Sequence, residues 1–167
     1  MIFLGVSIMS TVCIVNNCYL IECCNIVALK CVADLFVEKK KDLLFHHIMA
    51  LTLIHYINQH RDIKPLTDEV SSILSTEIST IFLVLNNYIH NSTLNNVNKL
   101  AFVITFYYYR IYNYSYLLLD KNVNSALYIY SRNNFEYLEI YTALYGLFLL
   151  NIYWGTLILK KIINTIK

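Results

Sequence analysis

Apolar residues in this chain form long, nearly continuous runs that are separated by short polar segments. Each run approaches the roughly 20 residues that an α-helix needs to cross the hydrocarbon core of a bilayer. Barrel strands are shorter and alternate in polarity, so these runs favour helices, which satisfy their backbone groups internally. The pattern therefore predicts an all-α, polytopic transmembrane helical bundle with about six spans, over residues 2–17, 19–37, 43–59, 69–89, 97–119 and 136–160.

The composition supports a single membrane domain over residues 1–167. Of the residues, 57% are hydrophobic and 14% are charged, with only 3 Gly and 1 Pro. A soluble domain of this size would have more charged residues and more turn residues. The net charge of +2 is small and the basic residues are scattered, so we expect no nucleic-acid partner. Membrane lipids are the expected partners, and the sequence predicts no oligomeric state.

Basic residues beside the predicted spans indicate the orientation of the chain. Lys39–Lys41 separate the second and third spans, and Lys160 and Lys161 close the sixth. Six spans place both groups on the same side, which the positive-inside rule makes cytoplasmic. Both termini are then expected to be cytoplasmic. The first apolar run is interpreted as a retained helix, with a signal peptide as the alternative.

A carboxylate and a histidine pair flank the turn near residue 40. Asp34 and His46 each lie about six residues from it, hence roughly 9 Å deep at the helical rise, so they can meet. A carboxylate can fix the tautomer of an imidazole, which suits acid–base chemistry or metal ligation. Lys30 has the spacing to pair with Asp34. Two interpretations stay open: a catalytic group of Asp34, His46 and His47, or a neutralised carboxylate with interfacial histidines.

A second pair of charges is predicted deeper in the bundle. Glu77 and Arg110 each lie about 16 residues from the connection near residue 93, so both fall towards the middle of a span. An unpaired charge there costs several kcal/mol, whereas a hydrogen-bonded pair is tolerable. We expect both side chains to face the interior and to interact, directly or through a bound head group. A purely structural salt bridge is the favoured interpretation.

Other chemistry has little support in the sequence. The five cysteines lack the paired CxxC spacing that a zinc site would need, so no metal site is predicted. No GxSxG, P-loop or GxGxxG motif is present. Transport is less favoured than lipid binding because the Gly and Pro residues that interrupt transporter helices are scarce.

The polar positions, taken in order, resemble a known family. Four elements carry the likeness: Asp34 before His46-His47, the segment Glu77-Ile78-Ser79-Thr80-Ile81-Phe82-Leu83, Arg110 after the aromatic run 102–109, and Asn151-Ile152-Tyr153-Trp154. Together they are similar to the TLC domain (TRAM, LAG1 and CLN8 homology), with a core at about 25–160 in this chain. The family's ExSTPFL segment has proline where this chain has Ile81. The proline kink of that segment is therefore not predicted here.

The resemblance implies a lipid-linked, multi-pass protein of the endoplasmic reticulum or another endomembrane. Ceramide synthases of this family carry an HDxxD segment, whereas the corresponding stretch here holds Glu77 and Ser79. The chain thus looks closer to the smaller TLC-domain membrane proteins. The leading hypothesis is handling of membrane lipid or fatty-acyl groups. The alternative is a non-catalytic protein that binds or senses lipids and alters bilayer composition.

If the protein is an enzyme, the implied reaction is acyl transfer. His46 or His47 would act as general base and Asp34 would orient the imidazole. Acyl-CoA is the implied cofactor only for this enzymatic interpretation. The polar part of the substrate would be held by the remaining matched positions: Glu77, Ser79, Arg110, Asn151 and Trp154.

Overall fold

The computed structural model describes residues 20–60 and 64–166 of the chain. The described residues form helices and contain no strand, which confirms the all-α class. In chain order they are α2 (Leu20–Val37), α3 (Lys41–Gln59), α4 (Lys64–Ser75), α5 (Glu77–Leu85), α6 (Ser92–Thr105), the π-helix η1 (Phe106–Asn113), α7 (Tyr114–Leu119), α8 (Lys121–Tyr130) and α9 (Asn134–Ile166). The predicted first span, 2–17, lies outside the described residues.

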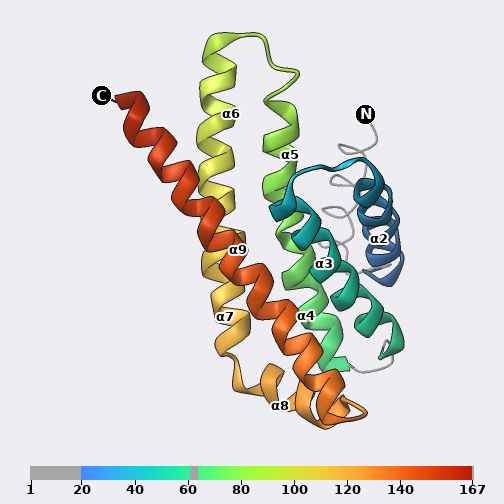
Figure 1. The fold of residues 1–167 in the computed structure, drawn as a ribbon. Coiled ribbons are helices and arrows are strands. Elements are labelled where there is room, and N and C mark those ends of the chain that lie inside the picture. The colour runs from blue at the N-terminus through green and yellow to red at the C-terminus, as the bar shows by residue number, and fades with distance from the viewer. Residues whose placement is uncertain (1–19, 61–63, 167) are drawn as a thin grey trace.

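The helices run up and down an elongated bundle (Figure 1). Helices α2 and α3 form an antiparallel pair, α4 leads into α5, and α6, η1 and α7 return in the opposite direction. The long α9 crosses this bundle diagonally and packs against α3 and η1. The α5–α6 loop and the C-terminus lie at one end, and the α2–α3 loop faces the same end but lies further down the bundle (Figure 1). The lysines predicted to be cytoplasmic are therefore gathered towards a single end of the bundle.

Within the described residues, one helix is long and apolar enough to cross a membrane by length and composition. It covers Asn134–Thr165 of α9, and a shorter apolar helical stretch covers Val70–Leu85. The six-span topology therefore stays a prediction. Many large apolar side chains nevertheless face outward, among them Leu29 and Phe36, whose exposed fractions are 72% and 86%. Such a surface suits a bundle whose outside contacts lipid.

The core lies where α2, α3, α4, α7 and α9 meet. Small residues let the helices approach there, as in membrane bundles generally. A Cβ atom added at Gly146 of α9 would lie 3.1 Å from the Phe45 ring of α3. Gly155 of α9 likewise faces Tyr107, whose hydroxyl donates to the Gly155 carbonyl at 2.6 Å. These two contacts hold α9 close to α3 and to η1.

Two irregularities interrupt helices that the sequence predicted to be continuous. The fourth predicted span, 69–89, is divided at Thr76 into α4 and α5. The fifth, 97–119, changes from α-helix to π-helix over η1 and back again. A π-helix is rare, and its wider turn displaces the side chains from the faces that a regular helix would give them. The two irregularities meet where Arg110 of η1 contacts Thr76.

Candidate functional site

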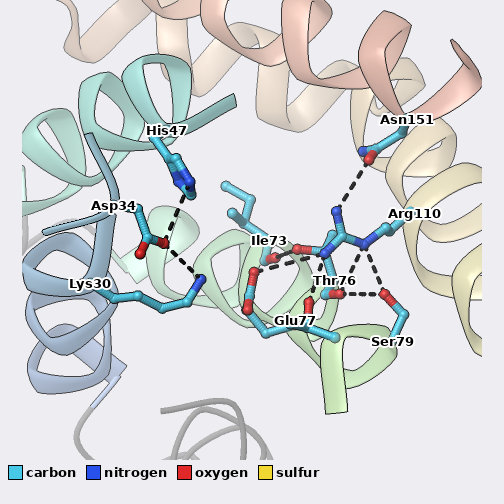
Figure 2. A network of polar contacts seen from close by, with 10 residues as sticks. Lys30, Asp34, His47, Ile73, Thr76, Glu77, Ser79, Arg110 and Asn151 are labelled. Carbon is cyan, nitrogen blue, oxygen red and sulfur yellow. Dashed lines mark hydrogen bonds and ion pairs between the residues drawn. The ribbon is translucent and has the colours of Figure 1, made fainter. Parts of the chain in front are cut away.

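Arg110 lies at the centre of the polar residues inside the bundle. It is in η1, and only 7% of it is exposed. From η1 its side chain extends towards α5 on one side and α9 on the other (Figure 2). The guanidinium also lies near two aromatic rings, with its carbon 5.7 Å from the Phe106 centroid and 6.0 Å from that of Trp154. These contacts hold its plane in a single orientation.

The guanidinium of Arg110 donates hydrogen bonds to both neighbouring helices. Its Nε–H is shared between the Ser79 hydroxyl at 2.8 Å and the Thr76 carbonyl at 3.2 Å. Nη2 donates to the Thr80 hydroxyl at 2.9 Å, and Nη1 donates to the Asn151 side-chain oxygen at 3.4 Å (Figure 2). A buried arginine is tolerable only when its donors are satisfied in this way.

The interruption at Thr76 belongs to this network. The Thr76 carbonyl accepts from Arg110 and also from the Ser79 hydroxyl, at 2.9 Å. A side chain that competes for a helical carbonyl is an ordinary cause of a kink. The break therefore arises without a proline and lies five positions before Ile81. No proline kink was predicted at Ile81. The contact between Arg110 and the Thr76 carbonyl, which accompanies the break at Thr76, was not predicted from the sequence.

The predicted contact between Glu77 and Arg110 is present. Glu77 Oε1 lies 3.9 Å from Arg110 Nη2, which is long for an ion pair. The other carboxylate oxygen, Oε2, is buried and has no hydrogen-bond partner among the described residues. Glu77 therefore offsets the charge of Arg110 and keeps one acceptor available in the interior. A buried acceptor without a hydrogen-bond donor lowers the stability of the folded protein, so a donor from a bound ligand or water would be favourable here.

The carboxylate of Asp34 contacts His47 rather than His46. Its Oδ2 lies 3.4 Å from His47 Nε2 and 3.7 Å from Lys30 Nζ (Figure 2). The predicted pairing of Asp34 with His46 is therefore wrong, because the partner is His47. The prediction that Asp34 lies at the same depth as the histidine pair was right. Adjacent residues on a helix point about 100° apart, so only one of the two imidazoles can face α2. His47, which is 5% exposed, is that residue.

His46 instead faces α9, where its ring centroid lies 5.4 Å from that of Trp154. Trp154 Nε1–H donates to the carboxylate of Asp42 at 2.9 Å. This bond holds the pKa of Asp42, which precedes the predicted third span, below its usual range. Sequence reasoning missed Asp42, and an acidic residue in the first turn of a helix was the only signal for it.

An internal cavity of about 50 Å³ brings several predicted residues together. This volume accommodates roughly three or four water molecules. Its polar lining residues are Lys30, His46, Thr76, Glu77, Arg110 and Asn151, and its walls are otherwise mainly apolar residues of α2, α3, α4, η1, α7 and α9. Tyr114, which sequence reasoning missed, also lines the cavity, and its buried hydroxyl has no partner among the described residues.

The other predicted site residues lie outside the cavity lining. Ser79 supports Arg110 from α5, and Trp154 packs against His46. Asp34 and His47 form a separate cluster that reaches the cavity through Lys30. In the part of the chain that the structure describes, no three His, Cys, Asp or Glu side chains are placed to hold a metal ion.

The sequence of the chain matches one known protein family. The family model of the TLC domain (TRAM, LAG1 and CLN8 homology) matches residues 7–160. The chain belongs to the TLC domain family. Searches of curated proteins and of solved structures gave no match. Membership indicates a membrane-associated, lipid-related protein, and the cavity described above lies within the matched TLC domain.

Proposed function

We propose that this TLC-domain protein binds the polar group of a membrane lipid or fatty-acyl compound in the cavity beside Arg110. One observation carries the proposal: His46, Glu77, Arg110 and Asn151, from four different helices, line one cavity with apolar walls. Lipid sites combine these features, because a few polar groups orient the ligand and apolar surface contacts its hydrocarbon.

The charges favour an uncharged polar group over a phosphate. Arg110 is near Glu77, and Lys30 is near Asp34, so neither cation presents an unbalanced charge. The unsatisfied Glu77 Oε2 and Tyr114 hydroxyl are suited to a hydroxyl, an amine or an acyl carbonyl. A group of this kind would restore the hydrogen bonds that these buried atoms lack.

The volume of about 50 Å³ limits what the closed bundle can hold. It suits the polar group of a ligand and leaves no room for a long hydrocarbon chain. Entry of the ligand's hydrocarbon chain therefore requires separation of α2 from α4. The apolar residues Cys24 and Val27 of α2 and Leu74 of α4 line the cavity at this contact. We expect the polar group to be bound inside and the chain to extend towards the bilayer.

Acyl transfer is the reaction that this arrangement would support. His46 would accept the proton of a hydroxyl or amine while that oxygen or nitrogen forms a bond to the acyl carbon. The thioester C–S bond of an acyl-CoA donor would break, and the thiolate would take up the proton. His46 is the better candidate base because it lines the cavity, whereas His47 contacts Asp34.

Lipid binding without catalysis is the alternative, and one observation favours it. His46 packs against Trp154, while the carboxylate expected to orient it contacts His47 instead. An imidazole base usually depends on a partner that fixes its tautomer. A protein that only binds or senses lipid would not need that partner.

Lipid analysis of cells that express single variants separates the two. His46→Ala is compared with wild type and with His90→Ala, a matched control in the exposed α5–α6 loop. An acyl product that appears with wild type and His90→Ala but is lost with His46→Ala supports catalysis. A changed lipid composition that persists in His46→Ala supports the non-catalytic alternative. No lipid change with folded, inserted wild type contradicts both.

We also propose a multi-pass topology in the endoplasmic reticulum or another endomembrane, with cytoplasmic termini. The lysines at one end of the bundle support this orientation. Glu77 and Ser79, which stand where ceramide synthases carry an acidic cluster, support closeness to the smaller TLC-domain proteins. Glycosylation acceptors placed in the α3–α4 connection and at the C-terminus test the topology. Modification of the C-terminal acceptor would contradict it.

A further inference from the structure

A second hollow lies at the end of the bundle, away from the Arg110 cavity. It has a volume of about 370 Å³ and is formed by the end of α5, residues 96–103 of α6 and the end of α9. This volume falls in the range of roughly 300–1,000 Å³ that is typical of small-molecule sites. The groove lies at the end that also carries the α5–α6 loop and the C-terminus (Figure 1).

The lining residues change from apolar to polar towards that end. On α6, Asn96, Asn98 and Lys99 precede Phe102 and Val103, so the polar residues are nearer the end of the bundle. On α5 and its C-cap the order is reversed along the chain, and Phe82 comes before Asn86. Because α5 and α6 are antiparallel, both helices present the same gradient (Figure 1).

The third wall of the groove has the same character. On α9, Ile158 is deepest, and the polar Lys161 and Thr165 follow towards the C-terminus with the apolar Ile162 between them. The gradient extends over about 10 Å, the rise of seven helical residues. An amphipathic lipid has this polarity: a polar head group at the interface and hydrocarbon below it.

The charge of the groove selects among lipids. Lys99 and Lys161 line it, and no carboxylate is among the described residues that do so. Amide and hydroxyl groups of Asn86, Asn96 and Thr165 add further hydrogen-bonding capacity. Cations without adjacent acids attract anionic head groups at a membrane surface. This differs from the Arg110 cavity, in which each cation lies beside a carboxylate.

We propose that this groove binds one anionic glycerophospholipid. Its phosphate contacts Lys99 and Lys161, and one acyl chain lies along Phe82, Phe102 and Ile158. The ligand enters from the bilayer, since the flanking residues Leu83 and Leu100 are exposed by 54% and 61%. This site is independent of the lipid binding proposed at Arg110, and its variants leave that cavity unchanged.

The test measures lipid retention by the purified full chain. The protein is reconstituted in nanodiscs of equal phosphatidylglycerol and phosphatidylcholine with identical acyl chains, and the lipids that remain bound are measured by native mass spectrometry. Wild type should retain phosphatidylglycerol preferentially. Lys99→Gln/Lys161→Gln should lower that preference about thirtyfold, which is about fivefold for each lysine and corresponds to roughly 1 kcal/mol per lysine.

Three further variants make the result specific. Lys39→Gln/Lys41→Gln removes the same charge near the same end but outside the groove, and should retain the preference. Lys99→Arg/Lys161→Arg keeps the charge and should also retain it. Val103→Trp fills the apolar part and should lower retention of both lipids.

Three outcomes would overturn the proposal. The preference could survive Lys99→Gln/Lys161→Gln, it could fall equally in Lys39→Gln/Lys41→Gln, or wild type could show no preference. Thermal unfolding of each variant in detergent shows that the fold is intact. Because His46 remains in every variant, the product assay for the Arg110 cavity is read separately, and either proposal can fail alone.

Discussion

The indole of Trp154 connects the end of one helix to the middle of another by donating a hydrogen bond to Asp42 at 2.9 Å. Asp42 is in the first turn of α3, and Trp154 lies well inside α9. The same indole packs against His46, one turn further along α3. The position of His46 at the cavity therefore depends on a contact between residues 112 positions apart.

Trp154→Phe should destabilise the protein in a pH-dependent way. The variant keeps an aromatic ring but loses the bond to Asp42, at a cost of about 0.5–1 kcal/mol at neutral pH. The bond lowers the pKa of Asp42 from its ordinary value of 3.8. Stability from a lowered carboxyl pKa is present above that ordinary value and is lost as the pH falls through the lowered one.

Thermal unfolding in detergent at pH 7 and at about pH 3 measures this effect. The difference between wild type and Trp154→Phe should shrink in acid. When Asp42→Asn is introduced into both proteins, the stability difference between them should be smaller at both pH values, because the charged acceptor of the Trp154 hydrogen bond is removed. A difference that grows in acid would contradict the assignment of the bond.

Arg110→Gln should be the most damaging of the polar substitutions. It leaves Glu77 buried without its cation and removes the bonds to Thr76, Ser79 and Asn151, so we expect a loss of about 3–5 kcal/mol. Glu77→Gln should cost far less, because the ion pair is 3.9 Å long. The double variant should cost less than the sum of the single variants. Additive costs from thermal unfolding would show that the two charges do not interact.

Much of the polar network could be predicted from the sequence because helix hairpins turn sequence distance into depth. Counting from the loops placed Glu77 near Arg110, and it placed Asp34 at the level of the histidine pair. The same arithmetic cannot give rotation about the helix axis. It therefore could not decide which imidazole, His46 or His47, meets Asp34.

The missed features depend on contacts between distant segments. No proline or glycine in the sequence indicates the break at Thr76, which forms where Arg110 donates a hydrogen bond to the Thr76 carbonyl. The π-helix η1 lies in an aromatic run that is equally compatible with a regular helix. Tyr114 lines the cavity because α7 packs against α9, a contact that the sequence does not indicate. Such features follow from packing, which overrides local preference.

Asp34→Asn should reduce stability and leave any lipid product unchanged. The carboxylate holds His47 at 3.4 Å and Lys30 at 3.7 Å, but it does not line the cavity. A partly buried charged interaction of this kind contributes about 1–3 kcal/mol. Glu139→Gln, which removes an exposed carboxylate from α9, is the matched control. Loss of product in a folded Asp34→Asn protein would instead give the carboxylate a role at the reacting centre.

Gly146 tests how closely α9 must approach α3. A Cβ atom there would lie 3.1 Å from the far end of the Phe45 ring and 3.5 Å from the sulfur of Met49. The Phe45 side chain is 41% exposed and can move by the few tenths of an ångström required. Alanine also gains about 1 kcal/mol of helix propensity over glycine. Gly146→Ala should therefore leave the unfolding temperature unchanged or raise it slightly.

Gly146→Val should have the opposite effect, because its additional methyl groups cannot be accommodated by movement of one ring. Overpacking of this kind costs about 1–3 kcal/mol, or several degrees in unfolding temperature. The two substitutions are compared by thermal unfolding in the same detergent. If Gly146→Ala is as damaging as Gly146→Val, Phe45 is held rigidly and the α3–α9 contact is tighter than its exposure indicates. That rigidity would also fix His46, one residue along α3, and a cavity opening by movement of α3 would then be excluded in favour of movement of α2.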